Sequence, residues 1–313
     1  MSGCPIVSCE WLYDQLQDDR KKSKIQILDV STSGSSGSGI KAAKLDFNEA
    51  HIEGANFYDI TLCRDKTSSI SNMLPSVGVF NDYVRYFGVS ADVHVVVYDN
   101  SDTGFDSTPR VWYCFRALNH RRVSILAGGL KLWTAKELPL TSNKTPDQKK
   151  EFNAGQWRRL DSIYSTISEV KRWLDRKSST NQENEEAITD TVYIDVRPKD
   201  QYNGTSTVGV KGCLPGHLPD SINVANAWKY LVDEHNQLRS VNEIKMLFAE
   251  DGLLEIIEKC NKVIVACNNG MESAVLFLAL TLIGTYKMSL YDGGWEEISK
   301  SIPDRIVKTE EVI

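Results

Sequence analysis

The chain has 313 residues, of which 41% are hydrophobic and 25% are charged, and its net charge is −6. This length and composition are typical of a soluble globular protein with two domains. The excess of acidic residues argues against a general binder of nucleic acids or of membrane surfaces. The sequence has no apolar run of the roughly 18 residues that are needed to span a membrane.

The first residues and the cysteines indicate the compartment. Residues 1–11 lack the basic and apolar regions of a secretory signal, and they are not an Arg-rich, acid-poor organelle presequence. The seven cysteines are scattered, with no Cys-x-x-Cys pair and none at zinc spacing with histidines. We therefore expect free thiols, no bound metal and a cytoplasmic location, with a mitochondrial location left open.

In chain order, short β-branched runs alternate with helix-like stretches. The first half predicts strands over 25–30, 93–98 and 123–126, and helices over 80–87 and 110–118. Such alternation is typical of a parallel sheet with helices on both faces. The polar stretch 141–160 predicts a linker between a domain at 1–140 and a second domain at 161–313.

Four landmarks recur in the same order in the two halves of the sequence. The paired positions are 165 to 168 residues apart: Asp29 with Asp195, His51 with His217, Asp99 with Cys267, and Gly128 with Gly293. A nearly constant separation of this kind indicates a duplicated domain. Both halves are therefore predicted to share one α/β fold.

Cys267 follows the β-branched run 263–266, and the apolar stretch 274–283 after it predicts a buried helix. Backbone N–H groups of a tight loop and the positive end of a helix dipole stabilise a thiolate placed between strand and helix. A buried, inert cysteine at a strand end is the other interpretation, and the segment alone favours neither. No arginine lies between Cys267 and Gly284, which argues against a phosphate-gripping loop.

These landmarks together resemble the tandem rhodanese-type sulfurtransferases over nearly the whole chain. The family includes thiosulfate and 3-mercaptopyruvate sulfurtransferases, and the likeness to the second group is closer. The signatures are His51-Ile-Glu-Gly-Ala55, Phe57-Tyr-Asp-Ile60, Met73-Leu-Pro75, Val96-Val-Tyr-Asp99, Pro109-Arg-Val-Trp112, Gly128-Gly-Leu130, Gly216-His-Leu-Pro219 and Asp292-Gly-Gly-Trp295. The resemblance implies two tandem rhodanese-like domains, with a catalytically silent first domain because Asp99 stands where the second has Cys267.

The reaction that the resemblance implies has two steps. Cys267 takes sulfur from a small donor, such as thiosulfate or 3-mercaptopyruvate, and becomes a persulfide. A thiol or cyanide then accepts the outer sulfur, with reduced thioredoxin as one family acceptor. No cofactor is implied. The loop that would hold a solvent-open thiolate consists of Asn268, Asn269, Gly270, Met271, Glu272 and Ser273.

The loop departs from the family pattern. Asn269 replaces a serine implicated in proton relay, and the two relay partners of that serine align with Thr61 and Asn72. The side chains of Asn268 and Asn269 could donate hydrogen bonds to an anionic sulfur donor, or these residues could adopt a left-handed turn. Glu272 replaces a threonine, and its charge would raise the pKa of the thiol and repel an anionic donor.

The candidate substrate-binding residues also depart from the family. Two arginines that hold the substrate carboxylate in the family align with Gln201 and Val210. The basic residues that remain are Arg197 and Lys211. Arg197 could bind an anion or form a salt bridge with a neighbouring carboxylate. The departures favour, as the alternative function, a weakly active or inactive module that binds partners or carries a persulfide.

Overall fold

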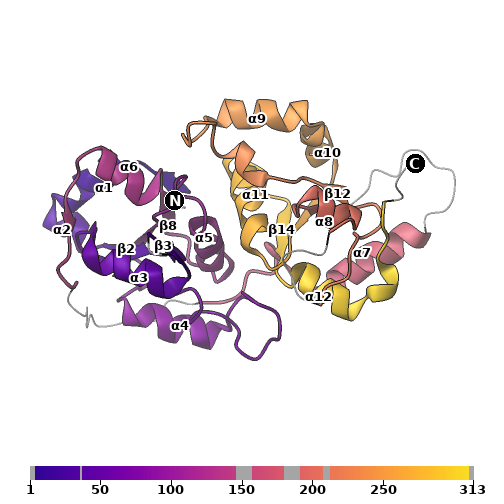
Figure 1. The fold of residues 1–313 in the computed structure, drawn as a ribbon, viewed down its shortest axis with the longest axis horizontal. Helices are drawn as coiled ribbons and strands as arrows, with labels where there is room; N and C mark the ends of the chain where they lie inside the picture. The colour runs from indigo at the N-terminus through magenta and orange to yellow at the C-terminus, as the bar shows by residue number, and fades with distance from the viewer. Residues whose placement is uncertain (1–3, 36, 146–156, 180–190, 207–211, 310–313) are drawn as a thin grey trace. The chain divides into compact units, whose positions relative to one another are not determined.

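The computed structural model describes residues 4–35, 37–145, 157–179, 191–206 and 212–309 (Figure 1). The chain forms two compact units, each with its own parallel sheet. The first comprises Met1–Lys66, Leu74–Leu160 and Val232–Leu238, and the second comprises Thr67–Met73, Asp161–Leu231 and Arg239–Ile313. The predicted α/β fold of two tandem domains is confirmed.

The first unit has a five-stranded sheet in the order β1-β8-β7-β2-β6, and every pair of neighbours is parallel. Its strands are β1 Ile6–Val7, β2 Ile25–Asp29, β6 Ala55–Phe57, β7 His94–Tyr98 and β8 Val123–Leu126. Its helices are α1 Cys9–Leu16, α2 Asp19–Lys22, α3 Ile40–Glu49, α4 Val77–Tyr86, α5 Thr108–Ala117 and α6 Gly129–Ala135. Two short antiparallel pairs join β3 Ser33–Gly34 to β4 Gly37–Ser38, and β5 His51–Ile52 to β9 Leu140–Thr141.

Helices cover both faces of this sheet, which explains the continuous apolar runs of its strands. Successive residues of a strand point to opposite faces. Val95 and Val96 of β7 are nevertheless both fully buried. Val96 packs in a cluster with Leu12 of α1 and Trp133 of α6. Burial on both sides is typical of parallel sheets.

The predicted helix at 80–87 begins earlier than expected. α4 starts at Val77 because Ser76 caps it, and the Ser76 hydroxyl accepts a hydrogen bond from the Val79 N–H at 3.3 Å. Serine is a preferred residue at this capping position. The apolar pattern marks the buried face of a helix, whereas the cap marks its first turn.

The second unit repeats the architecture, with the strand order β10-β14-β13-β11-β12 and all neighbours parallel. Its strands are β10 Tyr164–Ser165, β11 Thr191–Asp195, β12 Ile222–Asn223, β13 Lys262–Ala266 and β14 Met288–Tyr291. Its helices are α7 Ile167–Ser179, α8 Lys199–Asn203, α9 Val241–Glu250, α10 Leu253–Lys259, α11 Met271–Leu282 and α12 Gly294–Ser301, with 3-10 turns η1 Ala227–Tyr230 and η2 Pro303–Arg305. The middle strands β7 and β13 correspond, so Asp99 and Cys267 follow equivalent strands.

Much of the expected linker, 146–156, lies outside the described residues. On its near side, Thr141 pairs with His51 in the first unit. On its far side, the Leu160 N–H donates to the Ala117 carbonyl at 2.8 Å.

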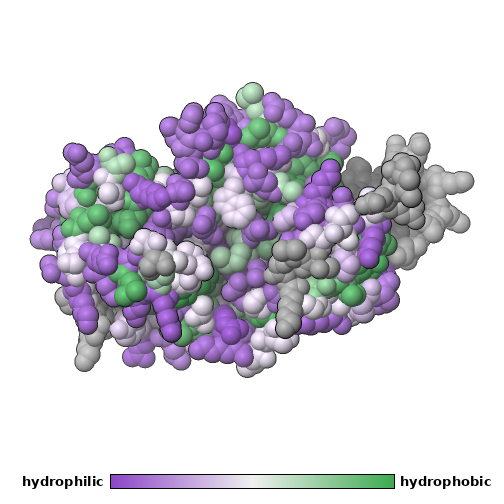
Figure 2. Space-filling view, in the orientation of Figure 1, coloured by the Kyte–Doolittle hydropathy of each residue, from purple (hydrophilic) through white to green (hydrophobic). Residues whose placement is uncertain are grey.

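Polar residues cover much of the face seen in Figure 2, with apolar residues scattered among them. The exposed large apolar side chains include Tyr286, Tyr86 and Met246, on separate elements. Among the described residues, no helix is long and apolar enough to cross a membrane.

Asp99 lies at the carboxyl end of β7 and is only 1% exposed. Its Oδ1 accepts hydrogen bonds from the N–H of Ser101 at 3.1 Å and from its hydroxyl at 2.6 Å. Its Oδ2 accepts from the N–H groups of Ser107 at 2.9 Å and Thr108 at 3.3 Å, at the start of α5. The loop and the helix N-terminus therefore bind a fixed carboxylate in the first unit.

Replacing this buried anion should destabilise the first unit. In Asp99→Asn, the neutral amide oxygen is a weaker acceptor than a carboxylate oxygen, and the NH₂ group faces N–H donors with which it cannot bond. The free energy of unfolding should therefore fall by about 2 kcal/mol. Urea unfolding followed by tryptophan fluorescence measures this change. Asp102→Asn is the control, because exposed Asp102 forms a surface ion pair with Lys131, and its replacement should change stability by less than about 0.5 kcal/mol. Equal midpoints for both variants would contradict this role of Asp99.

Candidate active site

Cys267 lies where β13 ends, in a loop held between a buried strand and a buried helix. The residues of β13 from Val263 to Ala266 are buried. α11 buries all residues from Ser273 to Leu280, which is why its sequence is apolar on every side. Gly270 joins loop to helix at φ +87°, in the left-handed region that glycine adopts readily. The thiol is therefore placed at the N-terminus of α11.

Loop donors surround the sulfur. The Gly270 N–H donates to Cys267 Sγ at 3.1 Å. Sγ lies 3.4 Å from the Ser273 hydroxyl. The Asn269 and Ser273 backbones also lower the pKa of the thiol. The loop therefore places an amide donor on the sulfur.

The first turn of α12 binds two carbonyls of the cysteine loop. The Trp295 N–H donates to the Cys267 carbonyl at 2.8 Å, and the Glu296 N–H donates to the Asn268 carbonyl at 3.2 Å. In a trans peptide the C=O of one residue and the N–H of the next point in opposite directions. Carbonyls held by α12 therefore turn the following N–H groups, of Asn268 and Asn269, away from α12.

Gly294 is required for this approach. It has φ +53°, and a Cβ there would lie 2.4 Å from the Asn268 oxygen and 2.5 Å from the Cys267 oxygen. The first unit repeats the arrangement at Gly129, where φ is +54° and a Cβ would lie 2.3 Å from the Asp99 oxygen. The repeated Gly-Gly motif therefore lets a helix start pack directly against the loop backbone.

The expectation of a solvent-open thiolate is wrong. Cys267 is only 2% exposed. Burial raises the pKa of the thiol, and the Glu272 carboxylate raises it further, against the lowering effect of the hydrogen bonds from Ser273 and Asn269. The sequence indicates the donors around the sulfur but not how completely the neighbouring elements exclude water. The thiol form is therefore favoured at neutral pH.

Glu272 lies in the first turn of α11 and is half-buried. Its Oε2 is buried and has no hydrogen-bond partner among the described residues. Burial raises the pKa of the carboxyl, the Asp195 charge raises it further, and the Arg197 charge lowers it. A carboxyl group with a raised pKa and an unused oxygen thus stands beside the cysteine loop.

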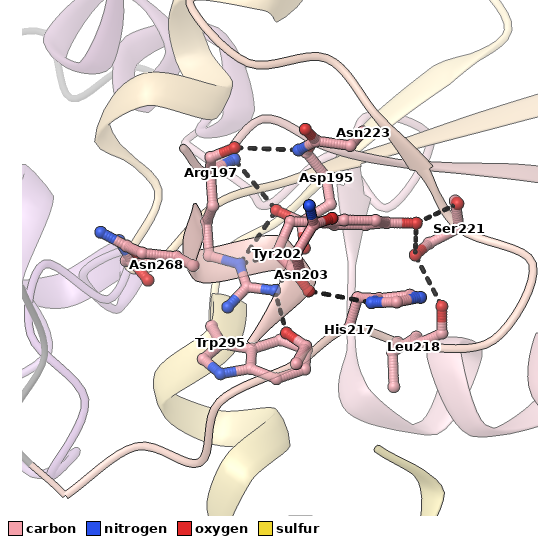
Figure 3. A network of polar contacts seen from close by, with 12 residues as sticks. Asp195, Arg197, Tyr202, Asn203, His217, Leu218, Ser221, Asn223, Asn268 and Trp295 are labelled. Carbon is pink, nitrogen blue, oxygen red and sulfur yellow. Dashed lines mark hydrogen bonds and ion pairs between the residues drawn. The ribbon is translucent and has the colours of Figure 1, made fainter. Parts of the chain in front are cut away.

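Arg197 is held in a buried network and is 1% exposed (Figure 3). Its Nε donates to both Asp195 oxygens at 3.0 Å, and its Nη2 donates to Asp195 Oδ2 at 2.7 Å and to the Gly216 carbonyl at 2.8 Å. The guanidinium carbon lies 3.6 Å from the centre of the Trp295 ring. Of the two roles left open by the sequence, the geometry fits the salt bridge.

The other predicted binding residues have different surroundings. The Asn268 Nδ2 donates to the Gln201 Oε1 at 3.0 Å, which joins the cysteine loop to α8. Lys211 and Val210 lie outside the described residues. Met271 is the first residue of α11, and Ser273 is fully buried. Among the described residues, Gln201 therefore hydrogen-bonds to the loop, whereas the guanidinium of Arg197 is paired with Asp195.

Asn269 is linked through hydrogen bonds to two residues that the sequence did not single out, Ser71 directly and Glu296 through Ser71. Its Nδ2 donates to the Ser71 Oγ at 3.3 Å. The Ser71 hydroxyl donates to Glu296 Oε1 at 2.5 Å, and the Ser71 N–H donates to Oε2 at 3.0 Å. The only sequence signal was the position of Glu296 directly after Trp295 of the Gly-Gly motif.

One interpretation of the loop asparagines is wrong. Asn268 and Asn269 do not adopt left-handed conformations, because Gly270 alone provides the positive φ in the loop. The Thr61 hydroxyl, at the position aligned with the relay aspartate of the family, donates to Asp59 Oδ1 in the first unit at 2.6 Å. Asn72, aligned with the relay histidine, has φ +58°.

The comparisons with known proteins agree with this geometry. The rhodanese-like domain family matches residues 8–136 and 175–301. The 3-mercaptopyruvate sulfurtransferase of Rattus norvegicus is 33% identical over 304 residues, 96% of this chain and 94% of that protein. The thiosulfate sulfurtransferase of Gallus gallus is 31% identical over 309 residues, 98% of each chain.

Solved structures share the fold. SseA from Escherichia coli, described as a 3-mercaptopyruvate sulfotransferase, has a TM-score of 0.72 and 28% identity, covering 94% of this chain and 99% of its own. The sulfur transferase subunit of yeast mitochondrial complex I has a TM-score of 0.79 at 23% identity, covering 98% and 100% of the two chains. The chain therefore belongs to the rhodanese family, in which the relatives that it matches are sulfurtransferases.

Proposed function

We propose that the protein transfers sulfur through a persulfide on Cys267. The observation that carries this proposal is the set of loop donors on Sγ, led by the Gly270 N–H at 3.1 Å. An anion at this position is stabilised by the amides and by the N-terminus of α11. The sulfurtransferase relatives support the same chemistry.

The reaction has two displacements. The Cys267 thiolate attacks the outer sulfur of thiosulfate, the S–S bond breaks, and sulfite leaves with the bonding electrons. With 3-mercaptopyruvate the C–S bond breaks, and the carbon fragment leaves as an enolate that takes up a proton. A thiolate or cyanide acceptor then attacks the outer persulfide sulfur and releases the Cys267 thiolate. Reduced thioredoxin is an acceptor of the required thiol class.

Neither of these anionic donors is well matched to the site. Arg197 is occupied by Asp195. Gln201 offers a neutral amide where the family has an arginine, and Glu272 adds a carboxylate. Turnover should therefore be low with both donors.

The first unit has no thiol at the equivalent place, since Asp99 occupies it and is saturated by hydrogen bonds. We infer that this half, residues 1–140, is catalytically silent and that 161–313 carries the reaction. The cytoplasm, where thiols stay reduced, suits this chemistry.

A second candidate function is a weakly active or inactive module that carries a persulfide or binds partners. Burial of Cys267 to 2% exposure and the raised pKa of its thiol favour this alternative. Both functions share the fold, so they differ only in whether the thiol accepts and releases sulfur at a useful rate.

Mass spectrometry separates sulfur transfer from an inactive binding module. After incubation with thiosulfate or 3-mercaptopyruvate, the intact protein should gain the mass of one sulfur atom, and Cys267→Ser should gain none. Loss of the added mass on treatment with a dithiol shows that the sulfur is transferable. A wild-type protein that remains unmodified with both donors supports the inactive module.

Removing the Glu272 charge should make the thiol more reactive. Because the carboxylate raises the pKa of Cys267, Glu272→Gln should shift the alkylation rate profile to lower pH. At neutral pH we expect roughly fivefold faster alkylation, the effect of about 1 kcal/mol of charge repulsion. In both proteins the rate rises with pH through the raised pKa, because the thiolate is the nucleophile.

The control for this change is Glu255→Gln, which removes an exposed carboxylate that pairs with Lys259. Its profile should match that of the wild type. If Glu272→Gln also leaves the profile in place, the Glu272 charge has no part in setting the pKa of Cys267.

Donor selection can be tested at Gln201. In Gln201→Arg a guanidinium gains access to the donor carboxylate, which should raise kcat/KM for 3-mercaptopyruvate about tenfold. Gln201→Leu, which loses the same hydrogen bond to Asn268 without adding charge, is the matched control. Equal kcat/KM values for the two variants would remove Gln201 from the donor site.

A further inference from the structure

Ser71 comes from the segment Thr67–Met73, which precedes α4 in the sequence but belongs to the second unit. Its backbone N–H and its hydroxyl both donate hydrogen bonds to one carboxylate. The Ser71 N–H donates to Glu296 Oε2 at 3.0 Å, and its hydroxyl donates to Oε1 at 2.5 Å. This two-point attachment fixes the position of the serine oxygen.

The direction of the hydrogen bonds follows from the donors available. An ionised carboxylate can only accept, so the single hydroxyl proton of Ser71 lies on the Glu296 side. The Ser71 oxygen can then only accept from Asn269, whose Nδ2 lies 3.3 Å away. Asn269 must therefore present its NH₂ group to Ser71, and the orientation of its amide is fixed.

Glu296 also holds the cysteine loop through its backbone. Its N–H donates to the Asn268 carbonyl at 3.2 Å, while its carboxylate reaches Asn269 through Ser71. One residue of α12 thus fixes two successive loop residues. The neighbouring Glu297 has a different partner, the Tyr291 hydroxyl at 2.7 Å.

We propose that Ser71 and Glu296 are positioning residues for the Cys267 reaction, which act through Asn269 to keep the loop amides on the sulfur. This inference rests on the proposed function. Asn269 directly precedes Gly270, whose N–H donates to Cys267 Sγ at 3.1 Å, so a displaced Asn269 moves this donor away from the thiolate. The hydrogen bonds that join Glu296, Ser71 and Asn269, here called the clamp, therefore offset part of the free-energy cost that burial imposes on the thiolate.

A double-mutant cycle tests the clamp. The alkylation rate of Cys267 with iodoacetamide is measured by peptide mass spectrometry over a range of pH in Ser71→Ala, Asn269→Ala and the double variant. Each single change should shift the rate profile to higher pH and slow alkylation at neutral pH about fivefold, the worth of one neutral hydrogen bond. The double variant should be no slower than either single variant, because both changes break the same contact.

Two further variants separate positioning from folding. Ser71→Thr keeps the hydroxyl and should restore the wild-type profile. Ser299→Ala removes a hydroxyl of α12 itself, which accepts from the Leu214 N–H at 3.2 Å. This change should leave the pH profile of alkylation unchanged. Glu296 is left unchanged throughout, so its charge does not confuse the comparison.

Independent effects that multiply in the double variant would overturn the proposal. So would a Ser71→Ala protein that melts at a lower temperature but keeps the wild-type pH profile, because Ser71 would then only stabilise the fold. Alkylation needs no sulfur donor, so this result is separate from the persulfide measurement. A wild-type protein that forms no persulfide rejects the proposed function, whereas an uncoupled cycle rejects only the clamp.

Discussion

Two hydrogen bonds between backbones, from the first turn of α12 to the carbonyls of Cys267 and Asn268, set the geometry on which the candidate site depends. Because a peptide is planar, fixing a carbonyl on one side fixes the next N–H on the other. The N–H groups of Asn268 and Asn269 are thus directed away from α12, and the Gly270 N–H that follows them donates to the sulfur, so this donor is in place before any substrate arrives. Burial of the same sulfur opposes this stabilisation, and the balance sets the reactivity of the thiol.

The two units show what this geometry does with different anions. In the first unit, N–H groups of the loop and of the start of α5 bind the Asp99 carboxylate. In the second, the Gly270 N–H donates to the Cys267 sulfur, and this sulfur becomes an anion only when the thiol loses its proton. The duplicated fold therefore holds a hydrogen-bonded carboxylate in one half and a thiol in the other. Only the thiol can act as a sulfur nucleophile, which is why only the second half is a candidate for this chemistry.

The sequence was sufficient for the fold, because β-branched runs, Gly-Gly motifs and a constant repeat distance are local signals. It also placed Cys267 between strand and helix. It could not reveal the clamp by Ser71 and Glu296, since these residues are far apart in the chain and meet only after folding. Nor could it decide between the roles of Arg197, because the choice depends on which buried groups surround the guanidinium. The extent of burial at Cys267 is likewise a property of tertiary packing.

The dependence of the loop on Gly294 has an evolutionary consequence. The hydrogen bonds from α12 are made to backbone carbonyls of the loop, so these bonds do not depend on which side chains the loop carries. Positions 268 and 272 can then change in sequence while the backbone around the sulfur keeps its position. Lineages built on this scaffold can diversify their chemistry by point substitution in one short stretch, without paying for a new fold each time.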